Sequence, residues 1–149
     1  MRKLKKKLTA IIFGISGQDG SYLANLLLNK NYNIFGTTRN ISKKNLNNLV
    51  RLEVLNKVKI IKCDVENFLA VKKLIKKIKP DAMYYLCGQS SVTKSYIYPA
   101  EAFKSNTLSL LNILEIVKKT NKKIKVFNAV SGQFYKNGKN NIFNEKSYI

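Results

Sequence analysis

Several residue types that build common functional sites are scarce or absent in this chain. Among 149 residues there is no His or Trp, and there are only two Cys, two Pro and eight acidic residues. Without His, a zinc site built from Cys and His is excluded, and we expect no metal site. Two cysteines, Cys63 and Cys87, are too few for a disulfide framework. Reduced thiols and a cytoplasmic location are therefore expected.

Long apolar runs are also missing. No stretch approaches the roughly 20 apolar residues of a membrane-spanning helix, so we expect no membrane segment. The basic residues 1–7 and the apolar stretch after them imitate a signal peptide, but that stretch is short and no small-residue cleavage site follows. A hydrophobic share of 45% is sufficient for one core. The sequence thus predicts one globular domain over residues 1–149.

The shortage of acidic residues leaves a formal net charge of +20, which is typical of nucleic-acid-binding proteins. The positions of the lysines along the sequence argue against that interpretation. Within residues 66–79, apolar side chains recur at helical spacing and five lysines occupy other positions, as on the solvated face of an amphipathic helix. Only three residues are Arg, and aromatic residues are not interleaved with basic ones, so nucleic acid is not the favoured partner. A small basic module that binds nucleic acid or another anion is kept as an alternative.

Apolar stretches alternate with helical patterns along the chain. The sequence predicts strands at residues 8–13, 33–38, 58–63, 82–86 and 125–129, and helices at 21–30, 66–79 and 99–120. Residues 42–56 are expected to be partly helical, and the polar residues 136–149 to form a loop or frayed tail. This alternation predicts an α/β fold of Rossmann-like, doubly wound type, with a parallel sheet of about five strands covered on both faces.

A glycine-rich turn lies between the first strand and the first helix. Residues 14–20 read GISGQDG. Such a turn lets the backbone approach a pyrophosphate, and the first N–H groups of the helix face the negative charge. Glycine spacing alone is weak evidence, but the flanking strand and helix strengthen it. The turn therefore predicts a phosphate site at the carboxyl ends of the strands.

The end of the second strand indicates which dinucleotide binds. A carboxylate there usually binds a ribose 2′-hydroxyl, whereas an Arg suits a 2′-phosphate. Here Arg39 follows the strand and no carboxylate is near, which favours NADP over NAD; the alternative is that Arg39 is only a surface cation. Asp64, after the third strand, is placed to accept a hydrogen bond from an adenine amino group. It is equally well placed to cap the following helix.

Two further strand ends carry polar residues. After the fourth strand, Gly88 allows close approach of the chain to a ligand, while Gln89 and Ser90 offer hydrogen bonds. After the fifth strand, Ser131 is expected at the carboxyl edge of the sheet, where its hydroxyl could bind a substrate oxygen near the nicotinamide.

These residues together resemble a known family. The string GQDGSYL at residues 17–23 is similar to the signature of GDP-mannose 4,6-dehydratases, in the extended short-chain dehydrogenase/reductase superfamily of NAD-dependent epimerase/dehydratase type. Arg39 and residues 63–65, 80–81, 89–92, 99–118 and 128–131 fall in register with that pattern, and the similarity covers residues 8–149.

The resemblance implies a lyase of nucleotide-sugar metabolism. Members bind NADP, oxidise the sugar at C4, eliminate water across C5 and C6, and return the hydride to C6. It implies GDP-mannose as the nucleotide-sugar substrate and a homo-oligomer as the complete enzyme. Ser131 matches the residue that contacts the sugar oxygen. The implied cofactor contacts are Gly14, Ser16, Gly17, Gln18, Asp19, Gly20, Arg39, Asp64, Val65, Leu86, Cys87, Gly88, Gln89 and Ser90.

The chain departs from the family pattern at three positions. Gln133 stands where the family has the glutamate that removes the C5 proton, and an amide cannot act as a general base. A 4-keto-sugar reductase or epimerase, which does not need that base, is therefore an alternative. Asn40 replaces a second arginine, and Glu101 replaces a tyrosine near the start of the long helix.

The family's catalytic Tyr-x-x-x-Lys pair has no counterpart in its expected place. Tyr135 and Lys139 have the right spacing, but Gly138 between them disfavours the helix that aligns such a pair. We therefore expect this chain to be a fragment, truncated before the Tyr-x-x-x-Lys helix and the substrate domain, and inactive on its own. Apolar surface that the remainder would cover is expected to promote aggregation or oligomers.

Overall fold

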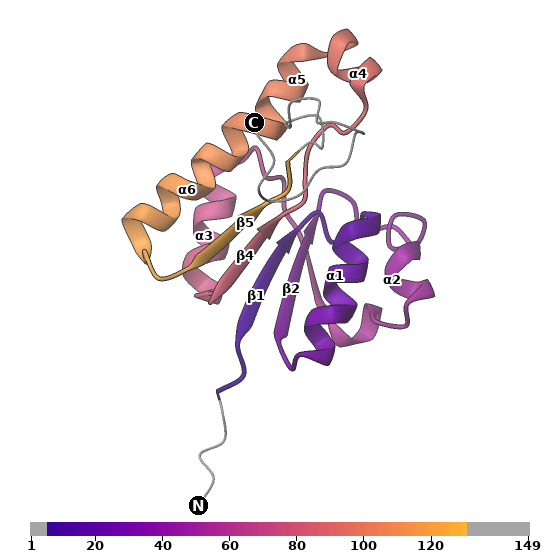
Figure 1. Cartoon of the computed structure of the whole chain (residues 1–149), viewed down its shortest axis with the longest axis vertical. Helices are drawn as coiled ribbons and strands as arrows, with labels where there is room; N and C mark the ends of the chain where they lie inside the picture. Colours follow the sequence, from indigo (N-terminus) through magenta and orange to yellow (C-terminus); the bar gives the residue numbers. More distant parts are fainter. Residues whose placement is uncertain (1–5, 131–149) are drawn as a thin grey trace, which may run out of the picture.

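The computed structural model describes residues 6–130, which form a five-stranded parallel sheet (Figure 1). The strand order is β3-β2-β1-β4-β5, and every neighbouring pair is parallel. The strands are β1 (Thr9–Phe13), β2 (Asn33–Thr38), β3 (Lys59–Lys62), β4 (Ala82–Tyr85) and β5 (Lys125–Asn128). The order reverses between β3 and β4, so the carboxyl ends of β1 and β4 meet at a topological switch point, where this class of fold binds ligands.

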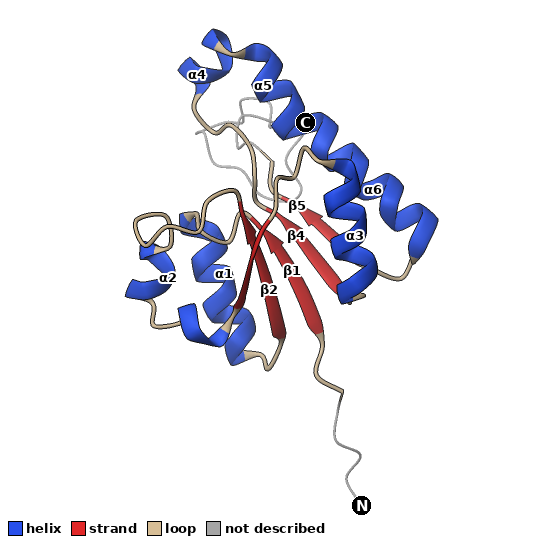
Figure 2. Cartoon of the chain, turned by 180° about the vertical axis from the view of Figure 1, so that it is seen from behind, coloured by secondary structure: helices blue, strands red, loops and turns tan. Residues whose placement is uncertain are grey.

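Helices cover both faces of the sheet (Figures 1 and 2). One face carries α1 and α2, while α3 and α6 pack on the other. The helical segments are α1 (Gln18–Asn29), α2 (Asn47–Arg51), η1 (Leu55–Lys57), α3 (Phe68–Ile78), α4 (Val92–Ile97), α5 (Pro99–Phe103), η2 (Lys104–Leu108) and α6 (Ser109–Thr120). The expected Rossmann-like architecture is confirmed.

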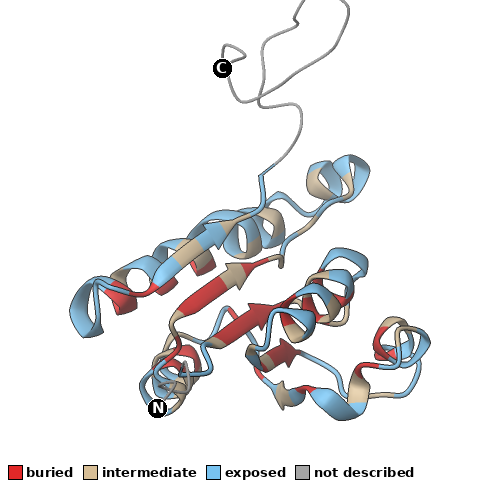
Figure 3. Ribbon diagram, turned by 60° about the horizontal axis from the view of Figure 1, so that its bottom comes forward, coloured by how far each residue is buried: buried red, intermediate tan, exposed pale blue. Residues whose placement is uncertain are grey.

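The central strand β1 divides the interior into two cores. Ile11 and Phe13 face α3 and α6, whereas Ala10 and Ile12 face α1, and all four are fully buried. The strands in the middle of the sheet are accordingly coloured as buried over much of their length in Figure 3. Successive side chains of a strand point to opposite faces, so a strand covered on both sides needs an unbroken apolar run. The apolar residues of β1, Ala10 to Phe13, meet that requirement.

The lysine-rich helix α3 follows the sequence prediction closely. Val71 and Ile75 are buried, while Lys73, Lys76 and Lys77 are exposed. The Asn67 side chain accepts a hydrogen bond of 3.0 Å from the Ala70 N–H and so caps the first turn. These lysines are the solvated face of an amphipathic helix, as expected.

Two helical segments differ from the sequence prediction. The segment from Pro99 to Thr120 includes a wider π turn, η2. Helix α4 was not predicted, because its six residues include no buried side chain and therefore show no apolar periodicity. It begins at a cap in which the Ser91 hydroxyl accepts from the Lys94 N–H at 3.3 Å.

Within residues 6–130, no helix is long and apolar enough to cross a membrane. The same residues contain no cluster of three or more His, Cys, Asp or Glu side chains that could hold a metal ion. Ser131 and Gln133, the two residues expected at the sugar, and segment 136–149 lie outside the described residues.

Candidate functional site

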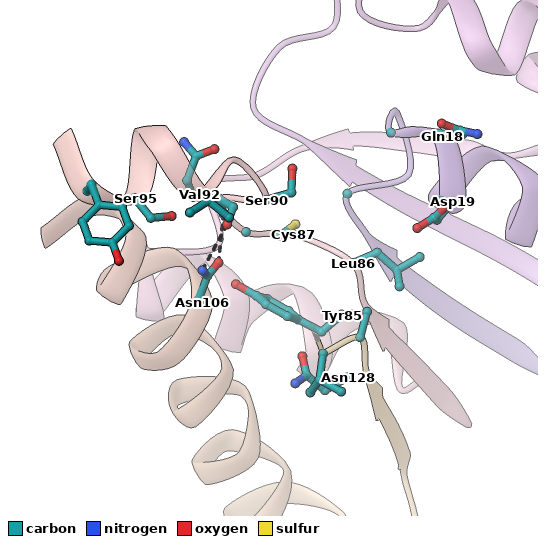
Figure 4. A pocket seen from close by; sticks show the side chains of 18 residues that line it. Gln18, Asp19, Tyr85, Leu86, Cys87, Ser90, Val92, Ser95, Asn106 and Asn128 are labelled. Atoms are coloured by element: carbon teal, nitrogen blue, oxygen red, sulfur yellow. Dashed lines mark hydrogen bonds between the residues drawn. The ribbon is translucent and has the colours of Figure 1, made fainter. Parts of the chain in front are cut away.

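Two neighbouring cavities lie at the carboxyl edge of the sheet, with volumes of about 960 and 810 Å³. Figure 4 shows the larger one, which is lined by the glycine-rich turn and the first turn of α1, the end of β4 and the loop after it, α4, Asn106 of η2 and the end of β5. The smaller one is lined by the ends of β2 and β3. The two share part of the glycine-rich turn and the loop after β4, namely Gly14, Gly17, Leu86, Cys87, Gly88 and Gln89. Together they form one site large enough for an extended ligand.

The glycine-rich turn is tied to β2. The N–H groups of Gly14 and Ile15 donate to the Thr37 carbonyl at 3.2 and 3.3 Å. Gly14 has φ +85°, and a Cβ there would lie 2.7 Å from the Leu86 carbonyl oxygen. Only glycine therefore fits between the turn and the end of β4.

The first turn of α1 opens into this site. Gly17 is the N-cap residue and supplies no side-chain cap. Within the described residues, the N–H groups of Gln18, Asp19 and Gly20 have no hydrogen-bond acceptor, and all three residues line the larger cavity. Free N–H groups and the positive end of a helix dipole form an anion-binding arrangement.

The end of β2 carries the second group of polar residues. Thr38, Arg39 and Asn40 line the smaller cavity, and residues 37–48 include no Asp or Glu. Asn45 joins this group from the loop before α2. Sequence reasoning missed Asn45, because an Asn in a polar loop has no distinguishing pattern.

Asp64 does not cap α3, since Asn67 performs that role. Instead, the Asp64 carboxylate accepts from the Glu66 N–H at 3.1 Å and closes the turn after β3. The helix-cap interpretation of Asp64 is therefore wrong. Asp64 and Val65 both line the smaller cavity, and contact with adenine stays a prediction.

A single amide clamps the loop after β4. The Gln89 N–H donates to Asn106 Oδ1 at 2.8 Å, and Asn106 Nδ2 donates to the Gln89 carbonyl at 3.2 Å (Figure 4). Beside this clamp, Gly88 has φ +145°, and a Cβ on it would overlap Asn106 Oδ1. Sequence reasoning missed Asn106 too, because nothing in the helix pattern distinguishes it.

The π turn that presents Asn106 is held by hydroxyl groups. The Tyr85 hydroxyl donates to the Ser105 carbonyl, and the Ser109 hydroxyl donates to the Lys104 carbonyl at 2.8 Å. Burial raises the pKa of Tyr85, so the phenol is neutral and available as a donor. These bonds satisfy carbonyls in the widened turn.

Cys87 lies where the two cavities meet. Burial raises the pKa of its thiol to about 12, and the nearby Arg39 charge only partly opposes this effect. Burial also raises the pKa of Cys63. Both thiols are therefore protonated at neutral pH and are poor nucleophiles.

The structure brings the predicted cofactor residues together. All fourteen of them, from Gly14 to Ser90, line one or both cavities. They come from the ends of β1, β2, β3 and β4 and from the first turn of α1. Parallel strands place these ends at the same edge of the sheet, which explains why distant sequence positions converge.

Comparison with known proteins identifies close sequence relatives. The sequence model of the GDP-mannose 4,6 dehydratase family matches residues 11–149. GDP-mannose 4,6 dehydratase 1 of Arabidopsis thaliana is 31% identical over 94% of this chain and 39% of that protein. GDP-mannose 4,6 dehydratase 2 of Caenorhabditis elegans is 33% identical over 91% of this chain and 38% of that protein. The chain thus spans about two fifths of the length of these relatives.

Solved structures of similar fold include two sugar-nucleotide epimerases. UDP-glucose-4-epimerase from Stenotrophomonas maltophila, a complex with NAD, matches with a TM-score of 0.80 at 16% identity, over 95% of this chain and 42% of that one. The UDP-Glc/GlcNAc 4-epimerase from Campylobacter jejuni matches with a TM-score of 0.77 at 22% identity, over 94% and 42%. These structures support the fold, and the sequence match supplies the family. The chain belongs to the GDP-mannose 4,6-dehydratase family.

Proposed function

We propose that this chain binds NADP and forms the cofactor-binding part of a nucleotide-sugar 4,6-dehydratase that converts GDP-mannose to GDP-4-dehydro-6-deoxymannose. Family membership and the two joined cavities support the proposal. The observation that carries the choice of NADP is the end of β2. There Arg39 lines the cavity and residues 37–48 contain no carboxylate, the combination that suits a 2′-phosphate.

The shape of the site fits a dinucleotide. We assign the pyrophosphate to the glycine-rich turn and the N-terminus of α1, the 2′-phosphate to Arg39, and the adenine to the side of Asp64. Glycine at position 14 lets the turn lie directly against the Leu86 carbonyl, so that both segments line the same site. Bound NADP would accept a hydride from the sugar and later return it.

The dehydration step is proposed for a protein of the relatives' full length. Ser131 is assigned to the sugar oxygen. At Gln133 the amide cannot remove the C5 proton, which favours a 4-keto-sugar reductase or epimerase as the second candidate function. The 149-residue chain should not turn over GDP-mannose by itself. Incubation of the purified chain with NADP and GDP-mannose tests this, and formation of a 4-keto sugar would contradict it.

The cofactor proposal is tested by titrating the folded chain with NADP and with NAD. We expect tighter binding of NADP, because only NADP carries a 2′-phosphate for Arg39. Replacing Arg39→Gln should weaken NADP binding about tenfold or more, the usual contribution of a hydrogen bond to a charged group, while NAD affinity changes little.

The matched control is Arg51→Gln. Arg51 is an exposed residue in the last turn of α2 and lines neither cavity. This variant removes the same charge and should leave the ratio of NADP to NAD affinity unchanged. A folded chain that binds neither nucleotide, or that binds both equally, would overturn the cofactor proposal.

A further inference from the structure

The polar residues at the end of β2 are organised around one side chain, Asn45. Its Nδ2 atom lies 2.8 Å from Thr38 Oγ1, 2.7 Å from the Asn40 carbonyl oxygen and 3.3 Å from Ser16 Oγ. These partners come from the glycine-rich turn and from the end of β2, and all of them line the smaller cavity beside Arg39. Asn45 thus connects two segments that are distant in the sequence.

The network determines which groups remain free to donate. A hydroxyl has one hydrogen to donate and two lone pairs that accept. Thr38 Oγ1 accepts from Asn45 Nδ2 and from the Asn40 N–H, the latter at 3.4 Å. Its own hydrogen donates to the Asn40 carbonyl oxygen at 3.2 Å, so both lone pairs and the hydrogen of the Thr38 hydroxyl are used within this network. The two hydrogens of Asn45 Nδ2 serve the two shorter contacts, so Ser16 Oγ, which lies 3.3 Å from both Asn45 Nδ2 and Thr38 Oγ1, keeps its own hydrogen to donate.

The Asn45 amide also bonds to a backbone acceptor near Arg39, the Asn40 carbonyl. A site for NAD provides an acceptor, usually a carboxylate, for the ribose 2′-hydroxyl. Near Arg39 the Asn40 carbonyl oxygen is such an acceptor, and two donors fill it, the Asn45 amide at 2.7 Å and the Thr38 hydroxyl at 3.2 Å. At the end of β2 the Asn40 carbonyl is therefore closed to a ribose 2′-hydroxyl, whereas the Arg39 guanidinium and the Ser16 hydroxyl can donate to a phosphate.

Asn45 is held in place by its own neighbours. Its backbone N–H donates to Ser42 Oγ at 3.2 Å, which fixes the loop before α2. From the first turn of α2, Asn48 Nδ2 donates to the Ser16 carbonyl at 3.1 Å and joins that helix to the glycine-rich turn. Asn45 and its hydrogen-bond partners are thus held in place from both sides before any ligand binds.

We infer that Asn45 is a positioning residue that sets the preference of this chain for a nucleotide 2′-phosphate over a 2′-hydroxyl, by joining the Ser16 turn to the end of β2 and, together with the Thr38 hydroxyl, by filling the Asn40 carbonyl. The inference rests on the proposed NADP site and adds a residue to it. It concerns selection between two cofactors rather than catalysis.

The test compares dissociation constants for NADP and NAD in the wild-type chain and three variants. Asn45→Ala removes the hydrogen bonds of the Asn45 side chain and should weaken NADP binding about tenfold, with little effect on NAD. Asn45→Asp keeps the shape of the side chain but replaces the donor with a carboxylate. It should weaken NADP binding further and strengthen NAD binding, because the carboxylate repels the phosphate and accepts from the hydroxyl.

Asn47→Asp is the matched control. Asn47 is an exposed residue at the start of α2 that lines neither cavity. The variant therefore adds the same negative charge as Asn45→Asp, but away from the end of β2. Its affinity ratio should stay close to that of the wild type. Circular dichroism and thermal melting establish that each variant is folded.

The possible results separate the two proposals. A wild-type chain without a preference for NADP overturns the cofactor proposal itself. A wild-type preference that persists in folded Asn45→Asp overturns the role of Asn45 and leaves the cofactor proposal standing. An equal loss of preference in Asn47→Asp also overturns the role of Asn45, because the loss would then result from the change in net charge.

Discussion

At the scale of single residues, Asn106 connects the long helical segment to the loop that lines both cavities. Its side chain bonds to the N–H and the carbonyl of Gln89, at 2.8 and 3.2 Å. Gly88 beside it has a backbone conformation that other residues rarely adopt. The clamp therefore fixes both polar groups of the Gln89 backbone beside a strained glycine.

Removing this clamp should weaken cofactor binding. We expect Asn106→Ala to lower NADP affinity about three- to tenfold, since each hydrogen bond contributes about 0.5–1.5 kcal/mol. Asn106→Asp keeps the acceptor for the Gln89 N–H but places a carboxylate against the Gln89 carbonyl and a negative charge in the cavity, so it should weaken NADP binding at least as much. Titration with NADP measures both.

Asn112→Ala provides the comparison for that experiment. Asn112 lies further along the same helix and lines neither cavity. Its replacement should leave NADP affinity unchanged. If Asn106→Ala binds NADP as tightly as the wild type, the clamp does not contribute to the site.

At the scale of elements, the segment from Pro99 to Thr120 combines a correct prediction with a missed feature. It begins at Pro99 and ends at Thr120, as Pro at the first turn and the apolar spacing indicated. The π turn at Lys104–Leu108 was not predictable, because the hydroxyl that bonds its Ser105 carbonyl belongs to Tyr85 on a strand. Local patterns do not record a partner from another element.

The π turn should depend on the Tyr85 hydroxyl. Tyr85→Phe would leave the Ser105 carbonyl without its donor, at a cost of about 1–3 kcal/mol in the free energy of unfolding. Urea denaturation measures this loss. Tyr84→Phe is the control, because the Tyr84 hydroxyl has no hydrogen bond among the described residues. Equal stability of the two variants would show that the bond does not support the turn.

At the scale of the whole molecule, an apolar stripe along the end of η2 and the start of α6 coexists with a high net charge. Leu108, Leu111 and Leu114 are 41, 52 and 45% exposed. Their spacing of three residues places them on the same side of the helix. The formal charge of +20 keeps copies of the chain apart at low ionic strength.

Self-association should therefore increase with salt. Screening shortens the range of charge repulsion to about 10 Å at 0.1 M salt, whereas contact between apolar side chains persists. Sedimentation velocity at increasing sodium chloride measures the association. The double variant Leu111→Gln and Leu114→Gln should reduce it, and Lys119→Gln on the same helix should not. A wild-type chain that stays monomeric at every salt concentration would contradict this prediction.

Much of the fold and of the candidate site could be predicted because it depends on local patterns. Strand β2 was predicted at its observed bounds, and α3 within two residues at each end, since apolar periodicity records which side chains are buried. The glycine-rich turn was recognised because a strand, three glycines and a helix start are consecutive. Parallel pairing then places the strand ends, and the residues after them, at one edge.

The remaining features depend on contacts between segments that the chain brings together only on folding. Asn45 reaches Ser16 across 29 positions, Asn106 reaches Gln89 across 17, and Tyr85 reaches Ser105 across 20. A hydrogen bond requires a donor and an acceptor at about 3 Å, and periodicity along one segment holds no information about the other. Composition and local pattern thus determined the fold class and the phosphate-binding turn, whereas packing alone decided which amides hold the site.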